Sequence, residues 1–284
     1  MLLNASGCLD ALTAPDTARA LDAFVTKTVT PERRVGNVPV RIAEADHGML
    51  NAIGLANPGR DLFLAETLPQ LRALGLSLWV SVGGFSADDY AETCALLDDV
   101  TIELNLSCPN VDEASASAAE IVGACRAATN LPLYAKLSPA TWDITETARA
   151  VEDAGADGLS LVNTMRGLVL DARGRPVLAP ATGGYSGPAL KPIALAAVYA
   201  CRRVTTLPIV GMGGVLTGRD ALEFIACGAN RVALGTVLFS DNEAPNRVRA
   251  ELTDAAQAVG FSDPREAFCA AFADTPASVV TLDN

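Results

Sequence analysis

The sequence predicts an α/β protein of the (β/α)8 barrel class, also called a TIM barrel, and two observations carry this prediction. Eight short β-rich segments recur along the 284 residues, and most of them are followed by an Ala- and Leu-rich stretch of helical character. Several of the strands are near-continuous apolar runs, as expected for parallel strands covered on both faces. Eight such units favour a closed barrel over an open sheet.

Each element is placed by its hydrophobic pattern and by the turn residues beside it. The predicted strands are residues 2–5, 23–27, 77–82, 101–105, 133–136, 158–163, 208–211 and 231–235. The predicted helices are residues 62–74, 88–97, 117–129, 144–154, 193–204, 219–227 and 244–259.

Two long inserts interrupt this alternation and are predicted as loops. Residues 30–60 follow the second strand, and residues 165–192 follow the sixth. Both follow the carboxyl end of a strand, which is the end where barrel enzymes build their active sites. Loops of this length are usually functional or disordered, and the motif-like sequence of these two favours function. Since no Ser/Gly-rich linker or low-complexity block divides the chain, we predict one domain over residues 1–284.

Composition excludes several classes of partner. Lys and Arg number 21 against 33 Asp and Glu, a net charge of −12, which argues against nucleic acid or an anionic membrane surface. We find no signal peptide and no apolar run of the roughly 18–20 residues that span a bilayer. The seven cysteines are scattered without a C-x-x-C pair, so neither a disulfide framework nor a metal site is predicted. We expect a cytoplasmic protein.

Two glycine-rich turns predict a phosphate site. The sequence Gly-Met-Gly-Gly ends the seventh predicted strand at Gly213 and Gly214, and Gly235 with Thr236 ends the eighth. Glycines let backbone N–H groups approach a phosphate closely. The loops after strands seven and eight form the common phosphate site of these barrels. Either turn alone is equally well explained as a tight turn, whereas both together favour a phosphate-bearing cofactor.

Cys108 is the candidate catalytic thiol. A free cysteine is more often a small buried apolar side chain than a catalyst, and that interpretation suits the cysteines on helical stretches: Cys94, Cys125, Cys201, Cys227 and Cys269. Cys108 instead follows a strand end among polar neighbours. A thiol has a reference pKa of about 8.5, near enough to neutrality for it to accept a proton.

Lysines and asparagines gather at the same strand ends. Lys27 precedes Thr28 after the second strand, and Lys136 ends the fifth. A lysine at an inward strand end needs an anion, which a ligand or a structural ion pair can supply. The amides of interest are Asn51, Asn105, Asn110 and Asn163. Together they suit a ring with alternating C=O and N–H groups, such as a pyrimidine dione, although a lone Asn would be a turn residue.

The motifs of this chain resemble those of a known family, the dihydroorotate dehydrogenases. The phrases that carry the resemblance run in order from Asn4 to about Leu238: ASG, TKT, GMLNAIGLANPG, ELNLSCPN, KLSP, AGADGLSLVNT, GGYSGPALKP, GMGG and GT. Cys at position 108 resembles the soluble class 1 enzymes. NAIGL and GMGG are most similar to the NAD-linked heteromeric subclass, in which a chain of this kind is the catalytic FMN subunit.

The resemblance implies FMN-dependent oxidation of (S)-dihydroorotate to orotate in pyrimidine (UMP) biosynthesis. Cys108 is implied as the base that removes the C5 proton while hydride passes from C6 to flavin N5. The residues implied to hold FMN are Ser6, Lys27, Thr28, Asn105, Lys136, Val162, Gly187, Gly213, Gly214, Gly235 and Thr236. Those implied to surround the substrate are Lys27, Asn51, Ala52, Ile53, Gly54, Leu55, Asn105, Asn110, Asn163 and Thr164.

The resemblance also implies a redox partner. The chain has no cysteine cluster for an iron–sulfur centre and no G-x-G-x-x-G unit after a strand. A subunit carrying FAD and a [2Fe–2S] cluster is therefore the expected acceptor, passing electrons to NAD, with fumarate or oxygen as the alternative. Class 1 relatives self-associate, so a homo-oligomer is expected.

The chain departs from the family pattern at two places. Ser81 stands where the family usually has Asn beside FMN, and Ser81 is not assigned to the cofactor. After Asn110 a short acidic segment, residues 111–117, replaces the usual glycine-rich stretch.

Two alternative functions remain open from the sequence. One is another FMN barrel that acts on a dihydropyrimidine without the carboxylate. The other is a non-catalytic flavin-binding subunit of a larger complex.

Overall fold

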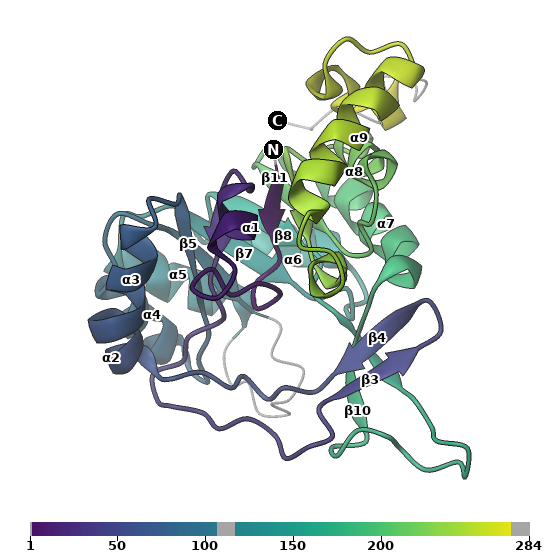
Figure 1. Cartoon of the computed structure of the whole chain (residues 1–284). Coiled ribbons are helices and arrows are strands. Elements are labelled where there is room, and N and C mark those ends of the chain that lie inside the picture. The colour runs from purple at the N-terminus through teal and green to yellow at the C-terminus, as the bar shows by residue number, and fades with distance from the viewer. Residues whose placement is uncertain (1, 107–116, 274–284) are drawn as a thin grey trace.

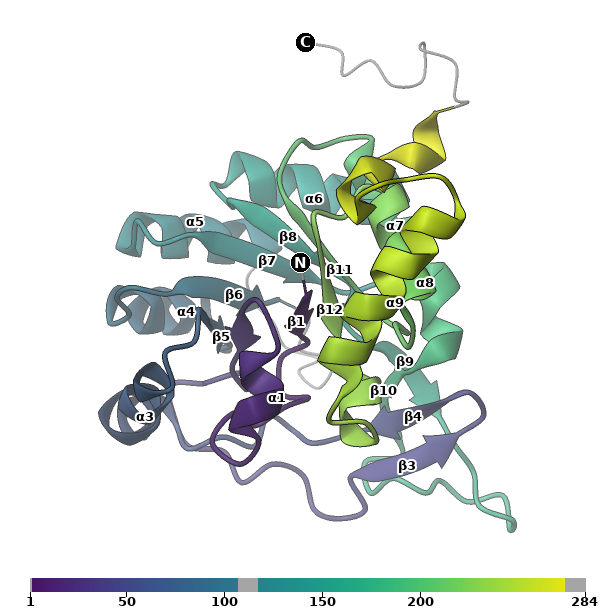
Figure 2. The same cartoon turned by 45° about the horizontal axis from the view of Figure 1, so that its top comes forward.

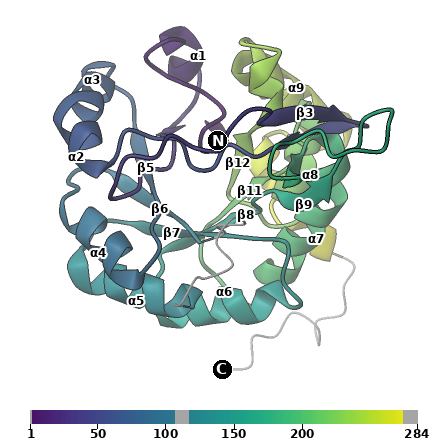
Figure 3. The same ribbon diagram turned by 90° about the horizontal axis from the view of Figure 1, so that it is seen from below.

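Eight parallel strands form the central sheet of the computed structural model, which describes residues 2–106 and 117–273. Their order is β1 (Leu2–Asn4), β12 (Arg231–Leu234), β11 (Ile209–Met212), β8 (Gly158–Leu161), β7 (Leu133–Leu137), β6 (Thr101–Asn105), β5 (Leu78–Val82) and β2 (Phe24–Val25). A parallel bridge between Leu3 and Ala23 joins the first strand of this order to the last. The strands form a ring with helices outside it (Figure 3), so the predicted (β/α)8 barrel is confirmed.

Helices cover the outside of the ring (Figure 2). The α-helices are α1 (Pro15–Arg19), α2 (Arg60–Leu62), α3 (Leu68–Ala73), α4 (Ala87–Ala95), α5 (Ala118–Ala128), α6 (Ile144–Asp153), α7 (Lys191–Arg202), α8 (Gly218–Ala226) and α9 (Ala244–Ala258). The short 3₁₀ helices are η2 (Pro188–Leu190), η3 (Thr236–Phe239), η4 (Pro264–Ala267) and η5 (Ala270–Phe272). In the chain from residue 2 to 106 and from 117 to 273, no helix has the length and apolarity needed to cross a membrane.

Local sequence explains where several helices begin. Ser86 caps α4 and Thr217 caps α8, each in a reciprocal capping box with the acidic residue three positions later, which satisfies two otherwise unpaired N–H groups. The helix predicted over residues 62–74 is instead divided. A π-helical turn, η1 (Phe63–Thr67), separates α2 from α3, and Pro69 lies in the first turn of α3. Pro lacks the N–H that a continuous helix would use there.

The two inserts lie where they were predicted, but both contain strands, so the prediction that they are loops throughout is wrong. Strands β3 (Ile42–Ala45), β4 (Gly48–Asn51), β10 (Thr182–Ser186) and β9 (Met165–Leu168) form an antiparallel sheet in that order. Strands β3, β4 and β10 lie at the bottom of Figure 1, and all four strands are labelled in Figure 2. Its central pair joins β4 to β10, with Asn51 opposite Gly184. The pairing partners lie more than a hundred residues apart in the chain, and β10 has two glycines and no apolar alternation. Neither feature is visible in a local hydrophobic pattern.

The amino-terminal end of the barrel interior is filled by large side chains. Trp79 and Tyr134 pack with ring centroids 4.4 Å apart. The guanidinium of Arg231 lies over the Trp79 ring and donates a hydrogen bond to the Tyr134 hydroxyl at 3.1 Å. Inward-facing apolar residues, among them Leu3 and Val210, complete this layer. The predicted site residues lie beyond this layer, at the carboxyl-terminal ends of the strands, together with the two glycine turns.

Candidate active site

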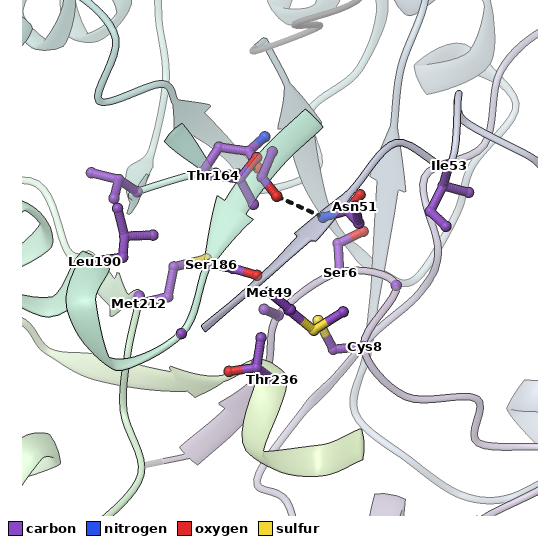
Figure 4. Close-up of a pocket in the computed structure, with 18 of the residues that line it drawn as sticks. Ser6, Cys8, Met49, Asn51, Ile53, Thr164, Ser186, Leu190, Met212 and Thr236 are labelled. Atoms are coloured by element: carbon purple, nitrogen blue, oxygen red, sulfur yellow. Dashed lines mark hydrogen bonds between the residues drawn. The ribbon is translucent and has the colours of Figure 1, made fainter. Parts of the chain in front are cut away.

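A cavity of about 370 Å³ opens at the carboxyl-terminal ends of the barrel strands. Its walls come from residues at or just beyond the ends of β1, β2, β6, β7, β8, β11 and β12. The second sheet supplies a further wall, with Met49 and Asn51 from β4 and Ser186 from β10 (Figure 4). The two inserts therefore contribute to the cavity that the barrel begins.

Most of the predicted site residues line this one cavity. From the predicted cofactor set they are Ser6, Lys27, Thr28, Asn105, Lys136, Val162, Gly187, Gly213, Gly214, Gly235 and Thr236. From the predicted substrate set they are also Asn51, Ile53, Gly54, Leu55, Asn163 and Thr164. Ala52 does not line it: its side chain is buried with Ala43, Leu50 and Leu178 in the second sheet's own core. Cys108 and Asn110 lie outside the described residues.

The two glycine turns form a cradle that fits a phosphate. Gly213 and Gly214 have φ of 121° and 79°, a backbone conformation that side chains disfavour. A Cβ added to Gly235 would meet no atom nearer than 3.8 Å, so this position is open space beside the cavity. Among the described residues, none accepts a hydrogen bond from the backbone N–H groups of Gly213, Gly214, Gly235 or Thr236. Clustered free N–H groups are what an anionic phosphate requires.

A chain of hydrogen bonds fixes the amides of Asn105 and Asn163 at the cavity wall. Asn163 donates from Nδ2 to Oδ1 of Asn105 at 3.1 Å, and Asn105 donates from Nδ2 to Oγ1 of Thr28 at 3.2 Å. The Asn163 Oδ1 also accepts the backbone N–H of Thr164 at 2.8 Å. These contacts define which end of each amide carries the donors. Both asparagines are therefore held in one orientation at the cavity wall.

Ser81 lies behind this wall and does not line the cavity. Its side chain is completely buried, and its Oγ is 3.0 Å from Oγ1 of Thr28. Its backbone N–H donates to Oγ1 of Thr26 at 3.1 Å. Ser81 therefore supports Thr28 from the interior.

Asn51 reaches the cavity because β4 pairs with β10. Its Nδ2 donates to the backbone carbonyl of Gly184 at 3.4 Å (Figure 4). Gly184 has no room for a side chain, because an added Cβ would lie 2.1 Å from Oγ1 of Thr164. Asn51 bonds to Gly184, and Gly184 packs closely against Thr164, so Asn51 is held near Thr164.

Charged groups gather at the floor of the cavity. Lys27 and Lys136 line it, and Lys136 lies 3.5 Å from the buried carboxylate of Glu103. The structural ion pair that the sequence left open is therefore present for Lys136. Burial raises the pKa of the Cys8 thiol above its usual value, although the positive charges of Lys136 and Lys27 oppose that shift.

Several cavity residues were not predicted from the sequence. They are Ala5, Gly7, Cys8, Ile42, Met49, Gly184, Ser186, Leu190, Met212 and Phe239. Met49 lies within the GMLNAIGL phrase, which was a usable signal. Ile42 and Phe239 have no such signal, because they reach the cavity through the second sheet and through η3. Glu103 was overlooked because acidic side chains are rarely buried unless paired.

Comparison with known proteins agrees with this arrangement. The family model described as dihydroorotate dehydrogenase matches residues 1–255. The chain is 42% identical over 254 residues to the "Dihydroorotate dehydrogenase B (NAD(+)), catalytic subunit" of Listeria monocytogenes, covering 85% of this chain and 84% of the relative. It is 46% identical over 245 residues to the protein of the same name from Latilactobacillus sakei, covering 81% and 80%. The chain therefore belongs to the dihydroorotate dehydrogenase family.

Proposed function

We propose that this chain is a catalytic subunit that binds FMN and oxidises (S)-dihydroorotate to orotate in pyrimidine biosynthesis. The observation that carries the proposal is the convergence of a phosphate cradle and an oriented amide wall on a single cavity. The names of its relatives supply the substrate class. We further propose that residues 1–284 act as a single FMN-binding domain located in the cytoplasm.

FMN would supply a hydride acceptor, and the chain would supply position and charge. The N–H groups of Gly213, Gly214, Gly235 and Thr236 would hold the phosphate. Lys27 and Lys136 would face the negative charge of the cofactor and of the substrate carboxylate. Ser6, Thr28, Val162 and Gly187 are proposed to complete the cofactor site, with Asn105 between cofactor and substrate.

The amides would hold the substrate ring in the orientation for reaction. Asn51, Asn105 and Asn163 offer donors and acceptors on different sides of the cavity, which matches the alternating C=O and N–H groups of dihydroorotate. The same space is bordered by Ile53, Gly54, Leu55 and Thr164. Ala52 and Asn110 are proposed as substrate residues only because the sequence resembles the family at those positions. Fixing the ring in this way replaces a random encounter by one orientation.

Cys108 is proposed as the base that takes the proton from C5 of the substrate. The support is its place in the ELNLSCPN phrase and its position three residues beyond the end of β6, whose last residue, Asn105, lines the cavity. A thiolate would accept the proton, so flavin reduction would rise with pH through the thiol ionisation.

Electrons are proposed to leave through a second subunit carrying FAD and a [2Fe–2S] cluster and to reach NAD. The support is the name of the relatives, which specifies both a catalytic subunit and NAD(+). We also propose that the chain forms a homo-oligomer. Val35 and Val38, which precede β3, have exposed fractions of 72% and 71%, and a subunit contact would remove such side chains from water.

Anaerobic mixing with substrate tests the proposed function. The purified, FMN-loaded protein is mixed with dihydroorotate, and the visible flavin absorbance is followed. We expect dihydroorotate to bleach the flavin and dihydrouracil, which lacks the carboxylate, to bleach it far more slowly. Equal rates with both compounds would indicate a different dihydropyrimidine enzyme. A flavin that neither compound bleaches would indicate a binding subunit without this activity.

A further inference from the structure

A buried ion pair lies where the cavity meets the barrel interior. Lys136 on β7 and Glu103 on β6 are joined by a 3.5 Å contact between Nζ and Oε1, and their side chains are 7% and 1% exposed. Lys136 lines the cavity and Glu103 does not. Glu103 lies two positions before Asn105, a cavity residue, on β6. Side chains two positions apart point to the same face of a strand, so Glu103 lies about 6–7 Å deeper in the barrel.

This pair is not required to fill the barrel. Two buried charges lose their hydration, and a well-packed apolar pair of similar volume is often as stable or more stable. The residue opposite Lys136 on β8 does not extend the ion pair into a larger hydrogen-bond network either. Ser160 lies opposite Lys136 in the β7–β8 register, and among the described residues its buried hydroxyl has no hydrogen-bond partner. A role in fold stability alone therefore explains the pair poorly.

Glu103 is the carboxylate that contacts Lys136. Lys27, beyond β2, and the Cys8 thiol, beyond β1, interact electrostatically with this pair. The charges of Lys136, Lys27 and Glu103 all shift the pKa of Cys8. Deeper in the barrel, Tyr134 on β7 accepts a hydrogen bond from Arg231. Around Lys136, the described groups are thus one carboxylate, one further ammonium and a thiol whose pKa burial raises.

We propose that Glu103 is a positioning residue that fixes the Lys136 ammonium at the cavity floor. This inference rests on the proposed function, because it assigns the positive charge to the flavin. Reduction adds negative charge to the bound cofactor, and a cation held at the cavity wall stabilises that charge. Without the Glu103 carboxylate, the Lys136 side chain would no longer be held in this position. Glu103 would therefore determine how strongly Lys136 raises the reduction potential of the flavin.

The test compares the flavin reduction potential at pH 7 in four proteins. They are the wild type, Glu103→Gln, Lys136→Met and the double variant, each loaded with FMN and equilibrated with reference dyes. We expect Lys136→Met to lower the potential when Glu103 is present. The same substitution should lower it less in the Glu103→Gln background, where the ammonium is no longer held. Glu251→Gln is the control, because it removes a carboxylate that pairs with Arg247 on α9.

Three outcomes would overturn the proposal. Lys136→Met could lower the potential equally in both backgrounds, Lys136→Met could leave the potential unchanged, or the wild type could hold no flavin. If Glu103→Gln does not fold, Glu103→Asp replaces it, since it keeps the charge but shortens the reach, and a smaller difference between the two backgrounds is expected. The dyes reduce the flavin without dihydroorotate. A chain that binds flavin but does not oxidise dihydroorotate would thus contradict the proposed function while still giving an answer on Glu103.

Discussion

Asn163 on the loop after β8 donates a hydrogen bond to Oδ1 of Asn105, the last residue of β6, at 3.1 Å. The strand between them, β7, carries Lys136 to the same cavity. The two amides and the ammonium are therefore held by three adjacent strands of the barrel. Strand pairing fixes Asn105 and Lys136, and the backbone N–H of Asn163 donates to the carbonyl of Leu137 on β7 at 2.9 Å, which favours precise orientation of a small ring.

Replacing Asn105 tests whether this amide pair binds the substrate. Asn105→Ala leaves the Asn163 donor without its acceptor, so we expect a loss of about 1–3 kcal/mol in the free energy of unfolding. We also expect at least about tenfold weaker binding of orotate, from the loss of one hydrogen-bonding partner worth about 1.4 kcal/mol. Orotate titration of the flavin spectrum and thermal unfolding measure the two effects.

Asn230→Ala is the matched control for that experiment. Asn230 accepts the backbone N–H of Ile209 at 2.9 Å at the amino-terminal end of the barrel, far along the strand axis from the cavity. This variant should lose stability and keep its orotate affinity. Orotate binding that is unchanged in Asn105→Ala, or equally weakened in both variants, would remove Asn105 from the substrate site.

Gly235→Ala tests the phosphate cradle. The added methyl meets no protein atom nearer than 3.8 Å and would occupy space assigned to the phosphate. We expect the FMN dissociation constant, measured by flavin fluorescence, to rise at least about tenfold, a cost of 1.4 kcal/mol. Gly123→Ala on α5 is the control, because its added carbon also meets nothing within 4 Å but lies on an outer helix. Retention of wild-type FMN affinity in Gly235→Ala would place the phosphate elsewhere.

The pH dependence of flavin reduction separates two thiols. Burial raises the pKa of Cys8 above its usual value, so Cys8 stays neutral across the range in which an activated thiol ionises. We expect the rate of flavin reduction by dihydroorotate to rise with pH in the wild type and in Cys8→Ala alike. Cys108→Ala should lose that rise and most of the rate. A Cys108→Ala variant with the wild-type profile would exclude Cys108 as the base.

We expect the Asp22 carboxylate to stabilise the folded protein at neutral pH and to lose this effect in acid. Burial raises the pKa of its carboxyl, but the backbone N–H of Leu2 at 2.6 Å and Arg249 at 3.2 Å outweigh this and hold the pKa below 3.8. Because the folded pKa is the lower one, the stabilisation is present above about pH 4 and is lost as pH falls through the folded value. Asp22→Asn should therefore cost about 1 kcal/mol at pH 7.

Urea unfolding at several pH values measures this difference. The two proteins should converge below pH 3.8, where the wild-type carboxyl becomes protonated. A difference that is independent of pH down to that range would assign the effect of Asp22 to packing instead of charge.

Barrel strands were predictable because each is a short local pattern. Residues 101–105 were predicted with the same bounds as β6, and the other seven strands differ by a few residues. The glycine turns and the strand-end lysines were also readable, since a barrel brings all strand ends to one face. The second sheet was not readable, because β4 and β10 are made by pairing distant segments. Glu103 was missed for a related reason: its partner Lys136 lies on the neighbouring strand, and sequence separation hides that contact.

A crystal structure of the protein with FMN and orotate tests the central claim most directly. We predict the FMN phosphate on the backbone N–H groups of Gly213, Gly214, Gly235 and Thr236, and the orotate ring between Asn51, Asn105 and Asn163. A phosphate bound away from both glycine turns, or an orotate that touches none of the three amides, would contradict the account.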